Sequence, residues 1–263
     1  MVSAEQWLLD RSTLRRIEVR TQVSYVGKWK QVQKYADHIP FPLQNYLKNK
    51  NKATGILIVD ATFTNVKGEG RAIMIAYDTG IGIIDYWIDY TENKTAYSYI
   101  FQRLDKVGYK PICVVSDGHF SILPVIKERN LSHQRCIFHL LKNLRFSLTT
   151  EGNWKTPKDH ILYSRIKGIL KTNNIEKLPE RIDKFREFER IFPGRKEVFK
   201  WFWSVVNDAA LHLSYEEDIP RTTALIENLN GQIKQRIKTF RGIKSEKSLD
   251  NLLKILFYFR KYK

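Results

Sequence analysis

Two apolar runs that each lead into an aspartate constrain the fold of this chain more than any other feature. Gly55-Ile56-Leu57-Ile58-Val59 precedes Asp60, and the run from residue 112 to residue 116 precedes Asp117. A continuous aliphatic and β-branched run of this length is typical of a central strand that is covered on both faces. A carboxylate that closes such a strand is costly unless a cation meets it, and a divalent metal would do so. Either aspartate alone could instead cap the turn or helix that follows it.

The pattern between residues 54 and 140 places further strands and helices around these two runs. We predict strands at 71–79 and 82–90, antiparallel to the strand before them, and a helix at about 94–108 that Gly108 ends. The strand at 112–116, a helix at 121–129, a short strand through Cys136 and a long helix follow. Strand, strand, strand, helix, strand, helix, strand, helix is the order of the ribonuclease H fold, an α/β fold with a mixed sheet flanked by helices. In that order Asp60 and Asp117 would face each other across about 5 Å of strand spacing.

Helical periodicity dominates the rest of the chain. Residues 154–215 show no convincing strand, and Phe199, Phe202, Trp203 and Val206 recur at helical spacing. This one-face periodicity predicts an all-α insertion with its own aromatic core and favours packing over a base-stacking surface. Further helices are predicted at about 222–240 and 246–261.

The N-terminal residues predict a small helical region. Short helices over residues 4–36 carry several basic side chains and could form a helix-turn-helix or pack on the main domain, and residues 46–52 are polar and predict a linker. We therefore predict four regions: a helical region that could bind DNA (1–50), the first part of the catalytic core (51–150), the helical insertion (151–218) and the C-terminal core helices (219–263).

The charge of the chain predicts a polyanionic partner. There are 45 Lys and Arg against 28 Asp and Glu, a formal net charge of +17. Nucleic acid is the leading candidate, and a generally lysine-rich proteome is the alternative explanation. Cys113 and Cys136 do not form a disulfide framework, no apolar run is long enough for a membrane span, and Glu5 and Asp10 stand where a signal peptide would be basic and then apolar. These features predict a soluble, cytoplasmic, nucleoid-associated protein with no membrane partner.

A Cys-x-x-His pair, Cys136 and His139, follows the second aspartate. The pair could be half of a zinc site completed by His133 and Cys113, but structural zinc usually requires two such pairs at close spacing. A buried cysteine beside a hydrogen-bonded histidine is the better interpretation. The chain has no Gly-x-x-x-x-Gly-Lys-Ser/Thr loop, so ATP is not implied. Thr62 stands where a competing class of phosphoryl-transfer enzymes needs a second acid.

In combination these motifs resemble the mutator-like transposases of bacterial and archaeal insertion sequences, members of the DDE transposase and retroviral-integrase superfamily. The resemblance covers about residues 55–242. Its motifs are Val59-Asp60-Ala61-Thr62, Ser116-Asp117-Gly118-His119, Gln134-Arg135-Cys136-x-x-His139-x-x-Lys142-Asn143-Leu144 and Arg221-Thr222-Thr223-Ala224-Leu225-Ile226-Glu227-Asn228-Leu229-Asn230.

The resemblance implies that Asp60, Asp117 and Glu227 form a catalytic triad that holds two Mg²⁺ or Mn²⁺ ions. It also implies an accessory role for Cys136 and His139 near the DNA ends. The chain departs from the family pattern at Ala224, where asparagine is common. Glu227 is not explained as part of a capping box, because the residue three positions after Thr223 is Ile226.

Other residues are weaker candidates. His119 either supports Asp117 or is simply a histidine at a strand end. Glu216, Glu217 and Asp218 are rival third acids, but they fall in a predicted loop. A basic track that could hold DNA phosphates consists of Arg135, Lys142, Arg145, Lys234, Lys238 and Arg241.

The predicted function is a DNA transposase that cleaves transposon ends and transfers them into target DNA with two metal ions. Its predicted partners are double-stranded DNA, comprising terminal inverted repeats and target, and at least one further subunit, because two DNA ends must be brought together. Two alternatives are an inactive or domesticated protein that binds DNA ends, and a ribonuclease H-like nuclease without strand transfer.

Overall fold

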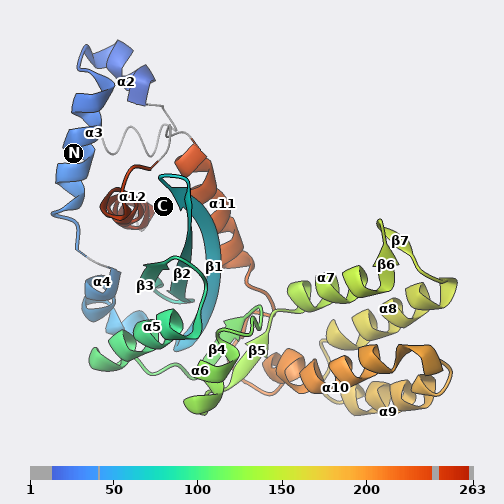
Figure 1. Cartoon of the computed structure of the whole chain (residues 1–263). Coiled ribbons are helices and arrows are strands. Elements are labelled where there is room, and N and C mark those ends of the chain that lie inside the picture. Colours follow the sequence, from blue (N-terminus) through green and yellow to red (C-terminus); the bar gives the residue numbers. More distant parts are fainter. Residues whose placement is uncertain (1–13, 41, 239–242, 261–263) are drawn as a thin grey trace. The chain divides into compact units, whose positions relative to one another are not determined.

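The computed structural model describes residues 14–40, 42–238 and 243–260 (Figure 1). Their contacts divide the chain into two units, each built around its own packed elements. Unit 1 combines residues 1–111 with residues 224–263, and unit 2 consists of residues 112–223.

Three consecutive antiparallel strands form the sheet of unit 1: β1 (Ile56–Val66), β2 (Glu69–Asp78) and β3 (Gly82–Asp89). β1 and β2 are joined by Lys67 and Gly68, both with positive φ (53° and 88°), as in the turns that best match strand twist. The prediction that Asp60 closes its strand was wrong. The pairing with β2 continues to Val66, and Asp60 lies opposite Ile75, at the point where β1 changes from fully buried to half-buried.

Three long helices pack against the strands of this sheet. α5 (Lys94–Lys106) packs on β2 and β3, and it begins at Asn93, whose side chain accepts a hydrogen bond from the backbone of Ala96. Gly108, with φ at 75°, follows the helix as predicted. α11 (Ala224–Lys238) packs on β1, and α12 (Glu246–Arg260) packs on β3 and on α3 (Tyr25–Ala36), which also contacts α2 (Leu14–Thr21).

Residues 46–52, predicted to be a linker, are instead mostly helical. α4 (Pro42–Lys48) packs on β3, and a 3₁₀ turn, η1 (Lys50–Lys52), follows it. Tyr46 is 5% exposed, and its ring meets that of Tyr109 edge-on at 5.2 Å. Lys50 donates a hydrogen bond to the carbonyl of Val107 at 3.0 Å. These tertiary contacts outweigh the polar composition of the segment.

Unit 2 begins with a parallel strand pair. β4 (Cys113–Ser116) and β5 (His133–Arg135) align Val115 with Gln134, and α6 (Leu123–Glu128) connects them. With three antiparallel strands in unit 1 and this parallel pair, the predicted α/β class is confirmed. No helix among the described residues is long and apolar enough to span a bilayer.

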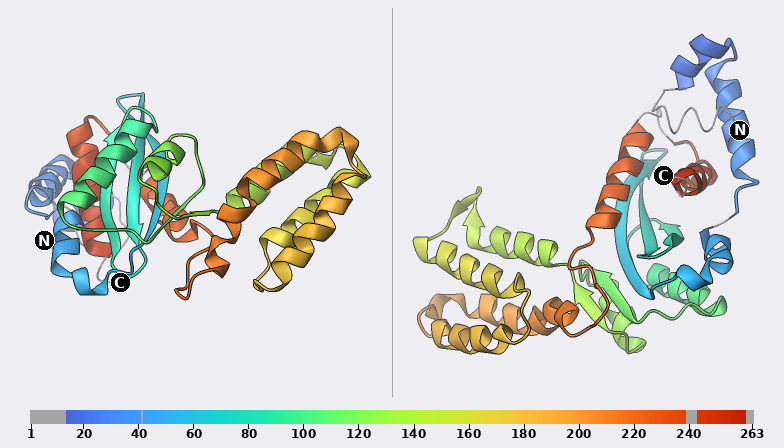
Figure 2. Two further views of the ribbon diagram at one scale, coloured as in Figure 1. Left: turned by 90° about the horizontal axis from the view of Figure 1, so that it is seen from below. Right: turned by 180° about the vertical axis from the view of Figure 1, so that it is seen from behind.

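The rest of unit 2 is mostly helical, as predicted for residues 154–215, with one short two-stranded hairpin (Figure 2). Phe199 and Phe202 are fully buried, and the Phe202 ring packs edge-on against Phe185 at 4.7 Å, which confirms the packing role of this aromatic stripe. The prediction that residues 154–215 contain no strand was wrong at its first residue, because Trp154 belongs to a two-residue strand. The elements are α7 (Ile137–Leu148), β6 (Thr149–Thr150), β7 (Asn153–Trp154), α8 (Pro157–Leu170), α9 (Lys177–Glu189), η2 (Pro193–Arg195), α10 (Lys196–Ala210) and η3 (Leu211–Leu213).

Candidate active site

Asp60 is held by a side chain from the C-terminal part of unit 1. The Nδ2 atom of Asn230 donates a hydrogen bond to Oδ2 of Asp60 at 2.8 Å, across 170 residues of sequence. Asn230 lies on α11 and is 7% exposed. Its other polar atom, Oδ1, is buried and receives no hydrogen bond from any described residue.

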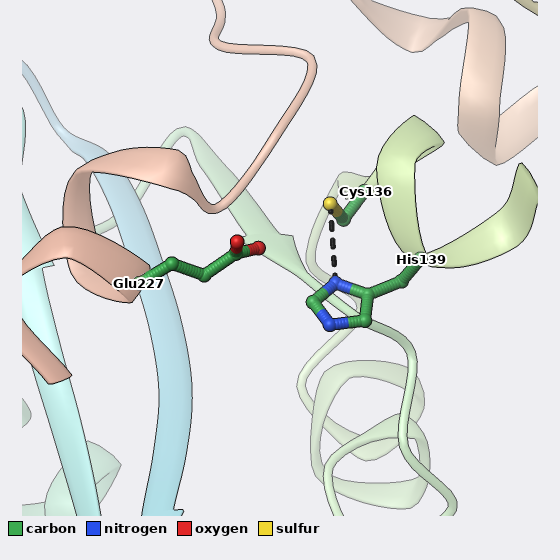
Figure 3. A group of neighbouring side chains, drawn as sticks. All are labelled: Cys136, His139 and Glu227. Carbon is green, nitrogen blue, oxygen red and sulfur yellow. Dashed lines mark hydrogen bonds between the residues drawn. The ribbon is translucent and has the colours of Figure 1, made fainter. Parts of the chain in front are cut away.

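Glu227 lies on the same helix, three residues before Asn230. Residues three apart in a helix lie on the same face, about one turn from each other. Because Asn230 contacts Asp60, the face of α11 that carries Glu227 is the face that packs on β1. α11 begins at Ala224, and Glu227 is half-buried in its first turn (Figure 3). Unit 1 therefore brings Asp60 and Asn230 into contact and sets Glu227 one turn away.

Asp117 lies in unit 2, directly after β4 as predicted. Its Oδ1 accepts a hydrogen bond from the backbone N–H of His119 at 2.8 Å, so the carboxylate also caps the turn that follows. Gly118 makes this turn possible. Its φ is 75°, and a Cβ atom at this position would lie 2.2 Å from Nε of Arg135. Nη2 of Arg135 donates to the carbonyl of Gly118 at 3.0 Å.

Arg135 is therefore part of the structure of this turn. Burial lowers the pKa of its guanidinium, although the carboxylates of Asp208 and Asp117 act in the opposite direction. Ser116 also contributes, because its Oγ accepts from the N–H of Gly118 at 3.1 Å and contacts Nε2 of His133 at 2.9 Å.

The Cys-x-x-His pair forms a small hydrogen-bonded cluster in unit 2. Nδ1 of His139 lies 3.3 Å from Sγ of Cys136 (Figure 3), and Thr223 approaches the same sulfur with its N–H at 3.4 Å and its Oγ1 at 3.5 Å. Burial disfavours the Cys136 thiolate, but the hydrogen bonds from His139 and Thr223 outweigh it and lower the thiol pKa. The N–H of Ile137 donates to the carbonyl of Arg221 at 2.9 Å. The cluster thus ties residues 221–223 to the start of α7.

The zinc interpretation gains no support from the geometry. Burial raises the pKa of Cys113 to about 11, and its thiol donates to the carbonyl of Val114. His133 faces Ser116 and, through Nδ1, Asp208 at 3.5 Å. Within either unit alone, the described residues contain no group of three His, Cys, Asp or Glu side chains close enough to share a metal ion.

The other predicted residues have varied surroundings. His119 is half-buried, and its Nδ1 accepts from the N–H of Ser121 at 3.4 Å. The rival acids, Glu216, Glu217 and Asp218, are exposed in a loop, as predicted. Lys142, Arg145, Lys234 and Lys238 are exposed on helices, whereas Arg241 lies outside the described residues.

Asn230, the residue that contacts Asp60, was not among the predicted site residues. The only available signal was its position three residues after Glu227, which predicts a shared helix face but not a contact with Asp60.

The fold and these side chains define an α/β protein with acidic residues on a strand, after a strand and on a helix, together with a strongly basic composition. The chain belongs to the Mutator family of transposases, whose family model matches residues 48–262. The resemblance noted in the sequence is thereby confirmed.

Individual relatives are distant. The transposase for insertion sequence element IS256 in transposon Tn4001 from Staphylococcus aureus is 23% identical over 237 residues, covering 81% of this chain and 57% of that protein, and the Enterococcus faecalis protein of the same description matches equally. The transposase for insertion sequence element IS905 from Lactococcus lactis is 24% identical over 183 residues. The match covers 66% of this chain and 44% of that protein. The chain spans little more than half the length of the first two relatives.

Proposed function

We propose that this chain catalyses metal-dependent cleavage at transposon ends and strand transfer into target DNA, on a ribonuclease H-like core interrupted by the insertion at 151–218. Membership of the Mutator family supports the reaction class. The observation that carries the proposal is the hydrogen bond from Asn230 to Asp60, because it comes from the same face of the helix that carries Glu227.

The donor set fits a hard divalent cation. Mg²⁺ and Mn²⁺ prefer oxygen ligands, which Asp60, Asp117 and Glu227 would supply. The buried Oδ1 of Asn230 is a further oxygen beside Asp60 that accepts no hydrogen bond from the described residues. Leaving such an atom unsatisfied costs about 1–3 kcal/mol, so a cation or its hydration shell would offset a real penalty. When two ions are bound, they activate the attacking water or 3′-hydroxyl and stabilise the leaving oxygen.

The chain's own residues then act as supports for the three acids. Asn230 fixes the orientation of the Asp60 carboxylate through Nδ2. The turn at Gly118, locked by Arg135, fixes the backbone beside Asp117. Cys136 and His139 act as accessory residues by holding residues 221–223, from which the chain runs directly into α11.

DNA is the proposed partner, with terminal inverted repeats and target DNA as the two substrates. The formal charge of +17 supports this, and exposed Lys142, Arg145, Lys234 and Lys238 are proposed phosphate contacts. At least two subunits would act together, and the protein would work at the nucleoid.

Nicking and joining assays test the proposal. An oligonucleotide duplex that carries a terminal repeat is incubated with Mg²⁺ or Mn²⁺ and a target plasmid. Removing one metal ligand removes several kcal/mol of transition-state stabilisation, so Asp60→Asn, Asp117→Asn and Glu227→Gln are each expected to lower nicking by at least about 10³-fold. Asp218→Asn, in the exposed loop, is the matched control and is expected to retain activity.

Each other result points to a different function. Binding without nicking by the unaltered chain favours a DNA-end-binding protein, and nicking without joining favours a nuclease. Full activity in any one of the three acid variants removes that residue from the triad.

A further inference from the structure

The outward face of α7 combines exposed aromatic and basic side chains. Phe138 is 53% exposed and Phe146 is 83% exposed, and Lys142 and Arg145 lie between them in the sequence. Positions 138, 142, 145 and 146 fall on one side of a helix, because they are separated by four, seven and eight residues. The opposite side is buried and consists of Ile137, Leu140, Leu141, Leu144 and Leu148. The two phenyl rings are therefore not part of the core that α7 builds.

The charge of this face is complementary to a polyanion. α7 contains Lys142 and Arg145 but no aspartate or glutamate. The Arg145 guanidinium also lies 5.8 Å from the centre of the Trp154 ring, which restrains it near the helix. Exposed aromatic rings interleaved with cations are the combination with which proteins hold bases and phosphates of unpaired nucleic acid.

We propose that this face of α7, defined by Phe138, Lys142, Arg145 and Phe146, binds unpaired DNA bases. The inference rests on the proposed function, because it takes DNA as the substrate. The phenyl rings would stack on base faces, and the two cations would contact the phosphates between them. In a fully paired duplex the base faces are covered by their neighbours, so only frayed or single-stranded segments offer a surface to Phe138 and Phe146.

The spacing of the rings suits such a strand. Phe138 and Phe146 are eight residues apart, which is about 12 Å along the helix axis. Phosphates along one strand of duplex DNA are about 3.4 Å apart along the axis, and an unstacked strand extends further per nucleotide. The two rings therefore match bases at most about three to four nucleotides apart, with room for the intervening phosphates near Lys142 and Arg145.

Fluorescence anisotropy with the full chain tests the proposal. The probes are a fully paired duplex and the same duplex with a single-stranded extension that contains 2-aminopurine, whose fluorescence reports stacking. Phe138→Ala and Phe146→Ala are each expected to weaken binding of the extended duplex by at least about fivefold and to reduce 2-aminopurine quenching. Binding of the paired duplex is expected to change little.

Charge and control variants separate the two kinds of contact. Lys142→Gln and Arg145→Gln are expected to weaken binding of both probes and to reduce the salt dependence by about 0.7 per lost phosphate contact on the single strand. Phe138→Tyr and Phe146→Tyr keep the ring and are expected to keep affinity. Ile191→Ala, an exposed apolar position elsewhere in unit 2 that is 56% accessible, is expected to change nothing.

Three results would overturn the inference. The first is an unchanged affinity and unchanged quenching when both phenylalanines are replaced by alanine. The second is an equal loss for the paired and the extended duplex in those variants. The third is a loss of self-association in analytical ultracentrifugation without a change in DNA binding, which would make the face a subunit interface. Nicking by the unaltered chain is measured separately, so failure of the proposed function is distinguishable from failure of this surface.

Discussion

Replacing Asn230 by alanine tests the link between unit 1 and metal binding. The substitution removes a 2.8 Å hydrogen bond to a carboxylate, a kind of bond that contributes roughly 1.5–3 kcal/mol, and also removes the buried Oδ1. Loss of a partner that orients a metal ligand typically lowers metal affinity 10–100-fold. We therefore expect Asn230→Ala to bind Mn²⁺ about 10–100-fold more weakly, which corresponds to roughly 1.4–2.7 kcal/mol.

Isothermal titration calorimetry with Mn²⁺, in the absence of DNA, measures this affinity directly. Asn228→Ala is the matched control, because Asn228 is exposed on the same helix and its Oδ1 accepts from Nε2 of Gln232, at 3.2 Å, rather than contacting Asp60. Asn230→Asp keeps an oxygen but loses the donor toward Asp60. In this variant the carboxylates of Asp60 and of the new aspartate repel each other, and a bound cation relieves the repulsion. Mn²⁺ is therefore expected to raise the unfolding temperature of Asn230→Asp more than that of the unaltered chain.

If Asn230→Ala binds Mn²⁺ as tightly as the unaltered chain, with both proteins equally folded by circular dichroism, Asn230 does not orient a metal ligand. Asn230 would then only pack between α11 and β1. If the unaltered chain itself binds no Mn²⁺, the proposed metal site fails before the role of Asn230 arises.

Three further predictions concern the supports of the fold. Burial raises the pKa of Asp85 to about 7, so the folded chain binds a proton that the unfolded chain has lost above its ordinary value of 3.8. The contribution of Asp85 to the free energy of unfolding is therefore fully present below about pH 4. It is lost as the pH rises to about 7, by up to about 1.4 kcal/mol per pH unit. The free energy of unfolding of Asp85→Asn, measured with urea relative to that of the unaltered chain, should therefore rise by up to about 3 kcal/mol between pH 5 and pH 8. Cys136→Ala leaves the N–H and hydroxyl of Thr223 without their sulfur acceptor, so hydrogen exchange at residues 221–223 should accelerate, whereas Cys136→Ser should preserve protection. Gly118→Ala should lower the unfolding temperature by the equivalent of at least about 1–2 kcal/mol, because φ is 75° there.

For each of these three predictions, one outcome would contradict it. A pH-independent difference between Asp85→Asn and the unaltered chain would show that Asp85 is ionised in the fold throughout. Equal exchange at residues 221–223 in the alanine and serine variants of Cys136 would show that the hydrogen bonds from Thr223 to Cys136 do not hold this segment in place. An unchanged unfolding temperature for Gly118→Ala would mean that the turn relaxes without cost.

The sequence predicted those elements whose pattern is local. The apolar run before Asp60, the hairpin that follows it and the helix between Asn93 and Gly108 all depend on side-chain period, caps and turn residues, and all three appear in the structure. Asp117 lies directly after its strand for the same reason.

The features that the sequence did not predict depend on contacts between distant segments. The polar stretch around Tyr46 becomes helical because its ring is buried against Tyr109. β1 continues beyond Asp60 because β2 pairs with it, although the apolar pattern stops there. Asn230 could be assigned to a helix face, but its partner 170 residues away could not be identified from spacing.

The discontinuity of unit 1 has a consequence for biosynthesis. A ribosome translates β1 before unit 2, yet the asparagine that binds Asp60 is made only after the whole of unit 2. A polypeptide whose synthesis stops before residue 224 thus lacks the helix whose asparagine holds the Asp60 carboxylate. On the proposed function, such a fragment is expected not to cut DNA.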